Sequence, residues 1–84
     1  MDTVFVYVLR SLKDGLFYVG MTTDCENRLM EHNTGKSKFT SGHMPWEMIY
    51  KESHLGYAAA RKREKYLKSA AGKRWLSKHL QSDL

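Results

Sequence analysis

The chain has 84 residues, of which 42% are hydrophobic and 27% charged. This length allows one hydrophobic core, so we expect a single domain over residues 1–84 rather than a disordered or collagen-like chain. The longest apolar run, residues 4–9, is far shorter than the roughly 20 residues of a membrane span, and no signal peptide is recognisable, so we expect a soluble, cytoplasmic protein.

Two strands are predicted at the start of the chain. Residues 4–9 are β-branched, aromatic and aliphatic without polar alternation, which indicates a strand at the middle of a sheet. Asp14-Gly15 predicts a two-residue hairpin turn, and residues 16–20 form the second, antiparallel strand. With such a turn, Tyr7 and Tyr18 lie on the same face of the sheet.

A helix is predicted over residues 24–33. Thr23 and Glu26 match a capping box at its start, and Gly35 is suited to the position just after its end. The residues that recur at three- and four-residue spacing, and so share the apolar side of this helix, are Cys25, Arg28, Leu29 and His32. Cys25 is the single cysteine, so no internal disulfide forms, and no close-spaced Cys/His pattern predicts structural zinc.

The second half of the chain predicts one more strand and two helices. Residues 36–44 are polar and predict a loop, and residues 46–50 predict a third strand after Pro45. A helix is predicted over residues 57–68, and Gly72 separates it from a final short helix over residues 74–80. The expected fold is α+β: a small antiparallel three-stranded sheet flanked by helices in the order ββαβαα.

Glu64 interrupts the apolar stripe of the predicted helix 57–68. The stripe comprises Tyr57, Ala60, position 64 and Leu67, and a carboxylate at such a position must be paired, bound to a metal or open to a cleft. A structural alternative is an ion pair at the edge of the stripe with Lys68, one turn further on.

At these residues the chain resembles the GIY-YIG nuclease superfamily, in particular its small stand-alone bacterial members and the N-terminal domain of an excinuclease. Residues 6–8 (Val-Tyr-Val) stand at the first motif and residues 18–20 (Tyr-Val-Gly) match the second. Residues 28–32 match the family's R-x-x-x-H segment, and residues 57–68 are similar to its A-x-x-R-E-K-x-L-K helix. Together these matches extend over most of the chain.

The resemblance implies a metal-dependent endonuclease that hydrolyses DNA phosphodiester bonds in repair, recombination or processing. Glu64 would bind Mg²⁺ or Mn²⁺, Arg28 would contact the scissile phosphate, Tyr7 or Tyr18 would activate water, and His32 would orient the tyrosine or take its proton. Each also has a structural interpretation: the tyrosines as core aromatics, and Arg28 and His32 as an ordinary half-exposed pair. Gly20 would end the second strand.

Basic residues are concentrated in the second half of the chain. The net charge is +5, and between Arg61 and Lys78 eight basic residues accompany one acid, a pattern typical of phosphate-backbone binding, although a solvated helix face has the same pattern. The candidate nucleic-acid-binding residues are Lys36, Lys38, Arg61, Lys65, Lys68 and Lys73. In the polar loop Thr40, Ser41 and His43 are further candidates by composition.

Two positions depart from the family pattern: Val6 replaces a glycine, and residues 73–77 contain no Asn where many family nucleases carry one. The alternative functions are a non-catalytic nucleic-acid-binding module and a protein-interaction domain of a larger repair or restriction assembly. A homodimer that cuts both strands is also compatible with the sequence.

Overall fold

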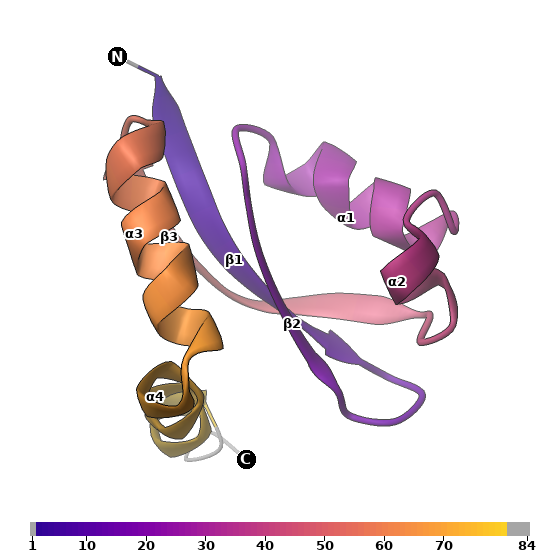
Figure 1. Ribbon diagram of the computed structural model, residues 1–84. Helices are drawn as coiled ribbons and strands as arrows, with labels where there is room; N and C mark the ends of the chain where they lie inside the picture. The colour runs from indigo at the N-terminus through magenta and orange to yellow at the C-terminus, as the bar shows by residue number, and fades with distance from the viewer. Residues whose placement is uncertain (1, 81–84) are drawn as a thin grey trace.

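The computed structural model describes residues 2–80 and consists of one sheet between two helical layers (Figure 1). The strands β1 (Thr3–Ser11), β2 (Phe17–Thr22) and β3 (Trp46–Leu55) are antiparallel in the order β2-β1-β3. The helices α1 (Cys25–Asn33) and α2 (Lys38–Ser41) lie on one side, and α3 (Tyr57–Lys68) and α4 (Ala70–Leu80) on the other. The predicted α+β fold is confirmed. Within residues 2–80, no helix combines the length and apolarity needed to cross a bilayer.

The central strand β1 supplies both halves of the core. Val4, Val6 and Val8 are fully buried and pack with Ala60, Leu67 and Leu76 of α3 and α4. Tyr7 and Leu9 point to the opposite face and pack with Trp46 below α1. Because β1 is covered on both faces, its sequence is apolar without alternation, as predicted.

The hairpin loop is longer than predicted. A two-residue turn would pair Tyr7 with Thr22, whereas the structure pairs Tyr7 with Gly20 and Leu9 with Tyr18. The Ser11 hydroxyl accepts hydrogen bonds from two loop amides, so residues 12–15 form the turn, and Gly15 has the positive φ of 77° that the turn requires. The pairing moves by two residues, so Tyr7 and Tyr18 still share a face, as predicted.

The cap of α1 is Asp24 rather than Thr23. The Asp24 side chain accepts a hydrogen bond from the amide of Asn27 at 3.1 Å. The strand β2 extends to Thr22, so the helix begins later than predicted. The Thr22 hydroxyl oxygen accepts a hydrogen bond from the Asp24 amide. The predicted capping box is therefore wrong, although Gly35 has the expected positive φ, 82°, after the helix.

Two elements around residue 45 differ from the prediction. The predicted loop 36–44 contains the four-residue helix α2, which is too short to produce a helical period in the sequence. The strand β3 continues five residues beyond the predicted end at Tyr50. Its second half alternates between exposed and partly buried residues, because β3 lies at the edge of the sheet.

The α3 helix has the predicted bounds, but α4 begins earlier than predicted. The helical conformation is interrupted at Ser69, between α3 and α4. The Ser69 hydroxyl oxygen accepts a hydrogen bond from the Gly72 amide at 3.2 Å, and Gly72 lies inside α4. A Cβ atom on Gly72 would overlap the Tyr66 carbonyl oxygen and the Leu67 backbone. Gly72 is therefore needed where α4 crosses the end of α3, and not as a helix breaker. Tyr57, expected on the buried stripe, is 56% exposed.

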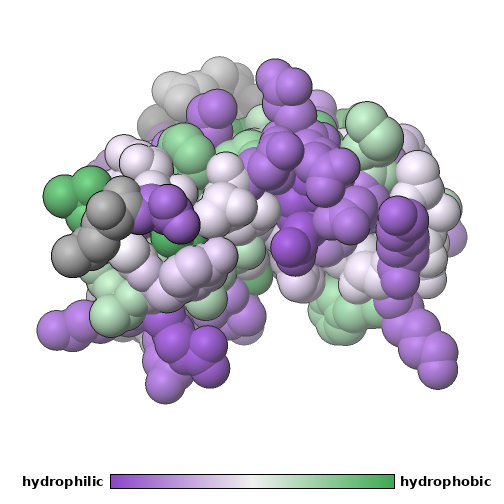
Figure 2. Space-filling view, turned by 90° about the horizontal axis from the view of Figure 1, so that it is seen from above, coloured by the Kyte–Doolittle hydropathy of each residue, from purple (hydrophilic) through white to green (hydrophobic). Residues whose placement is uncertain are grey.

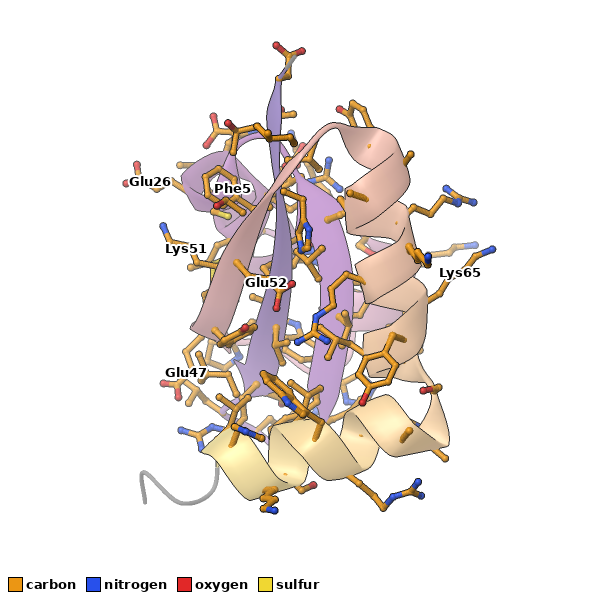
Figure 3. All side chains as sticks on the ribbon, turned by 90° about the vertical axis from the view of Figure 1, so that its left-hand side faces the viewer. Phe5, Glu26, Glu47, Lys51, Glu52 and Lys65 are labelled. Carbon is orange, nitrogen blue, oxygen red and sulfur yellow. The ribbon has the colours of Figure 1, made fainter. Side chains whose placement is uncertain are left out.

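Glu52 of β3 forms an ion pair with Arg63 of α3 (Figure 3). Its carboxylate accepts hydrogen bonds from the Tyr50 hydroxyl at 2.6 Å and from Arg63 Nε at 3.0 Å, and it contacts His54 Nε2 at 2.5 Å. Burial favours the neutral acid, but these three partners outweigh it and hold the pKa of Glu52 below its usual value. The carboxylate therefore stays charged and anchors α3 over the sheet.

Candidate active site

Three of the five predicted catalytic residues meet on the face of the sheet below α1. Tyr7 comes from β1, Tyr18 from β2 and His32 from the last turn of α1. The Tyr7 hydroxyl lies 3.0 Å from His32 Nε2, and the Tyr18 ring meets the His32 ring edge to face at 4.9 Å between centroids. The shared face of the two tyrosines and the inward side of α1 bring these residues together.

The other imidazole nitrogen is held by a residue that sequence reasoning assigned differently. His32 Nδ1 lies 2.8 Å from Thr40 Oγ1 on α2, and Thr40 is fully buried. The Thr40 carbonyl accepts the Trp46 indole N–H at 2.9 Å, which fixes α2 against β3. The loop composition suggested that Thr40 contacts DNA. Because its side chain is buried, it is not available for such a contact and instead positions His32. A polar residue eight positions after the histidine carries no recognisable sequence signal for this contact.

The protonation states of Tyr7 and His32 follow from their burial. Burial raises the pKa of the Tyr7 phenol far above its usual value, and the Tyr18 hydroxyl nearby acts in the same direction. Burial, followed by the positive charge of Arg28, lowers the pKa of His32. At neutral pH the phenol is therefore protonated and the imidazole neutral. The Tyr7 hydroxyl donates to Nε2, and Nδ1–H donates to Thr40 Oγ1.

Arg28 stands at the edge of this cluster, half exposed, rather than on the buried side of α1. Its side chain is 44% exposed, and Nε lies 3.0 Å from Glu31 Oε1. An open hollow of about 300 Å³ beside it is lined by Tyr18, Arg28, Glu31, His32, Lys36 and Ser37. The Arg28 charge opposes the rise in the Tyr7 pKa, so the guanidinium acts on the phenol electrostatically. A phosphate in this hollow would be within reach of Arg28 and Lys36.

Gly20 lies within β2 and makes room for the Tyr7 hydroxyl, instead of ending the strand as expected. A Cβ atom at this position would stand 2.5 Å from the Tyr7 hydroxyl oxygen and 2.7 Å from Cζ. The absence of a side chain therefore lets the phenol lie against the β2 backbone. Gly20 belongs to the site because it determines where the Tyr7 oxygen lies.

Glu64 lies on α3, on the other side of the sheet from α1. Its side chain is 17% exposed, and one carboxylate oxygen lies 3.5 Å from Lys68 Nζ, which is the ion pair of the structural interpretation. Among the described residues, no group of three His, Cys, Asp or Glu side chains could hold a metal. A single partly buried carboxylate nevertheless fits Mg²⁺, which commonly takes one or two protein carboxylates and completes its shell with water and phosphate oxygens.

A larger hollow of about 700 Å³ adjoins the first along β2. Its lining comes from the hairpin, α2, α3 and α4, and Tyr18 lines both hollows. Seen from above, the molecule shows a recess in its outline between two lobes, with hydrophilic side chains projecting on both sides (Figure 2).

The six candidate basic residues divide between these hollows and the outer surface. Lys68 and Lys73 line the larger hollow, and Lys36 lines the smaller one. Lys38 and Arg61 line neither hollow and are exposed. Lys65 also lines neither, and it projects from α3 on the side away from β3 (Figure 3).

The site thus consists of a tyrosine on each of two neighbouring antiparallel strands and a histidine and an arginine of the next helix. The chain belongs to the GIY-YIG catalytic domain family, whose sequence model matches residues 3–78. It is 37% identical over 70 residues to a UPF0213 protein of Staphylococcus epidermidis, covering 82% of this chain and 84% of that protein.

Two other proteins support the same assignment. A UPF0213 protein of Natronomonas pharaonis is 41% identical over 66 residues, which cover 77% of this chain and 76% of that protein. The solution NMR structure of a UPF0213 protein of Bacillus halodurans matches with a TM-score of 0.54 and 32% identity, over 90% of this chain and 83% of that one.

Proposed function

We propose that this protein is a divalent-metal-dependent endonuclease that hydrolyses DNA phosphodiester bonds. The observation that carries the proposal is the hydrogen-bonded series Tyr7–His32–Thr40, whose middle member His32 lines an open hollow together with Arg28. These three residues resemble a relay that activates a nucleophile. Tyr7 provides a hydroxyl, the neutral imidazole of His32 accepts its proton, and the buried Thr40 orients the imidazole. Membership of the GIY-YIG catalytic domain family supports the same reaction.

The raised pKa of Tyr7 determines how the relay works. A phenol that stays protonated at neutral pH is a poor base by itself. Tyr7 is buried in the free protein, so the attacking water would first have to reach its hydroxyl; Tyr7 would then take a proton from that water and pass its own to His32 Nε2, and no free phenolate would accumulate. Between the two tyrosines we assign this role to Tyr7, because its hydroxyl is hydrogen-bonded to His32. Tyr18, which lines both hollows, would orient the phosphate.

Two groups of residues would help to neutralise the negative charge of the phosphate. Arg28 and Lys36 line the smaller hollow and would stabilise the negative charge of the transition state. Glu64 on α3 would hold Mg²⁺ or Mn²⁺, and the bound ion would neutralise the phosphate and the leaving oxygen. For Glu64 to bind the ion, its carboxylate would release Lys68, which would then be available to a neighbouring phosphate.

The remaining basic residues fit a surface that follows a nucleic-acid backbone. Lys38, Arg61 and Lys65 would make phosphate contacts outside the hollows, which add affinity without reading sequence. We propose DNA repair, recombination or processing as the setting. One site cuts one strand, so cutting both would take two copies of the chain or a larger assembly.

The test is cleavage of labelled nicked, branched, single-stranded and duplex DNA with Mg²⁺ or Mn²⁺ and with EDTA. We expect metal-dependent cutting by the wild type, abolished in Glu64→Gln and strongly reduced in Arg28→Ala and Tyr7→Phe. The control is Glu26→Gln, an exposed carboxylate in the first turn of α1, which should cut like the wild type.

The Glu64–Lys68 ion pair also suits a second function, a nucleic-acid-binding module that does not cut, because a paired carboxylate needs no metal. Folded protein that binds these DNAs in a salt-dependent manner but never cuts them would establish that alternative. Such a result would also refute the nuclease proposal.

A further inference from the structure

The larger hollow is a mostly apolar groove, of which the proposed hydrolysis uses only Tyr18 and Lys68. Its walls are Leu16 and Phe17 of the hairpin region, Leu67 of α3 and Leu76 of α4. Its volume, about 700 Å³, lies in the range of small-molecule sites, which are mostly apolar with a few placed polar groups. The polar groups here are Lys68 and Lys73 and the Ser77 hydroxyl. The groove is therefore suited to an apolar ligand that carries negative charge.

An exposed aromatic ring lines the groove beside the catalytic cluster. Phe39 of α2 is 62% exposed, and its centroid lies 5.9 Å from that of Tyr18. An exposed phenylalanine at a concave site is a typical platform for a flat ligand. Tyr18 lines both the groove and the hollow that holds Arg28 and His32. A ligand in the groove would therefore be adjacent to the phosphate in that hollow.

We propose that the groove binds one unpaired nucleobase of the substrate, next to the scissile phosphate. The inference rests on the proposed function, because it takes nucleic acid as the ligand. A nucleobase has two apolar π faces that stack on an aromatic ring, and its neighbouring phosphates match the two lysines at the groove.

This inference defines the substrate class. A base inside a duplex is stacked on both faces and cannot enter the groove without first leaving the helix. The favoured substrates are therefore single strands, flaps and frayed ends, where the base is already free. Duplex DNA binds through its phosphates alone and does not use Phe39.

The test measures binding in EDTA, so that metal-dependent cutting does not interfere. Fluorescence anisotropy compares a short labelled single strand, the same strand with abasic sites, and a duplex of the same length. We expect Phe39→Leu, which keeps apolar bulk but removes the π face, to weaken single-strand binding about 5- to 150-fold. Phe39→Trp should bind like the wild type. Duplex binding and abasic-strand binding should be nearly unchanged in both variants.

The matched control is Met30→Leu, because Met30 is also 62% exposed but lies on α1 and does not line the groove. It should bind every DNA like the wild type. Circular dichroism checks the fold of each variant. If Phe39→Leu does not fold, Leu16→Ala tests the same groove from the hairpin side and should show the same selective loss.

Two results would overturn the inference. One is single-strand binding by Phe39→Leu that equals the wild type, and the other is an equal loss of single-strand and duplex binding. The proposed function is judged separately. Protein that shows the expected binding pattern but never cuts with Mg²⁺ keeps the base site and refutes the nuclease. If Phe39→Leu binds single strands like the wild type and still cuts DNA, the base-site proposal is refuted and the nuclease proposal stands.

Discussion

Replacing Gly20 with alanine should disable the site while leaving the fold intact. The new Cβ would lie 2.5 Å from the Tyr7 hydroxyl oxygen, where ordinary contacts begin at 3.4 Å, so the phenol must move by about 0.9 Å. A movement of that size along the hydrogen bond would stretch the 3.0 Å distance to His32 to about 3.9 Å, beyond hydrogen-bonding range. Misplacement by about 1 Å costs roughly 10²-fold in rate.

The cost in stability is expected to be smaller than the effect on catalysis. Overpacking of this kind destabilises by about 1–3 kcal/mol, which a shift of the urea midpoint measures. Gly35→Ala is the matched control: Gly35 lines neither hollow and the nearest heavy atoms lie 3.9 Å from the new Cβ, an ordinary contact, but the φ of 82° costs about 1–2 kcal/mol. It should be destabilised to a similar extent and still cut DNA like the wild type.

The assays are kcat/KM on labelled DNA and the NMR titration of His32, which reports the site without any reaction. In Gly20→Ala we expect both a lower kcat/KM and a changed His32 pKa. Wild-type cutting together with an unchanged His32 titration in this variant would refute the claim that Gly20 positions Tyr7.

Thr40, His32 and Asp14 support three further predictions. Thr40→Val leaves a buried imidazole N–H unsatisfied, so it should lose about 1–3 kcal/mol in urea unfolding and cut more slowly, whereas Thr40→Ser should keep both. Because His32 must be neutral to accept a proton and its pKa lies below 6.5, the pH–rate profile should be flat near neutrality and fall only below pH 6.5; a fall that begins above this value contradicts the relay. Hydrogen bonding from His43 lowers the pKa of Asp14 from 3.8 to about 2, so the stability it contributes is present above pH 3.8 and lost as pH falls to about 2. Asp14→Asn should remove this part of the acid unfolding curve.

The central part of the fold and the core of the site could be predicted because they depend on local pattern. The apolar run of β1 and the turn signal at Asp14-Gly15 fix a hairpin, and the shared face of Tyr7 and Tyr18 is preserved when the loop lengthens by two residues. His32 follows from the period of α1. These relations hold over short distances in the chain, where the sequence determines geometry directly.

The parts that could not be predicted depend on tertiary contacts or on elements without a period. The helix α2 has four residues, and its function is to bring Thr40 to His32, a contact between two helices that only the folded chain defines. From the sequence, Gly72 resembled a helix breaker. Only the packing of α4 against the end of α3 shows that a side chain at this position would collide with the Leu67 backbone. The distance from Glu64 to the tyrosines depends on how α3 packs over the sheet, which spacing along one helix does not determine.

The most direct test of the central claim is whether the purified wild-type protein, at neutral pH, cuts a labelled DNA flap with Mg²⁺ and not with EDTA, beside Tyr7→Phe. We predict metal-dependent product from the wild type and a rate reduced by about 10²- to 10⁴-fold in the variant, since the hydroxyl that starts the proton relay is missing. Intact DNA after incubation of folded, DNA-bound wild-type protein with Mg²⁺ or Mn²⁺, or equal cutting by Tyr7→Phe, would contradict the account.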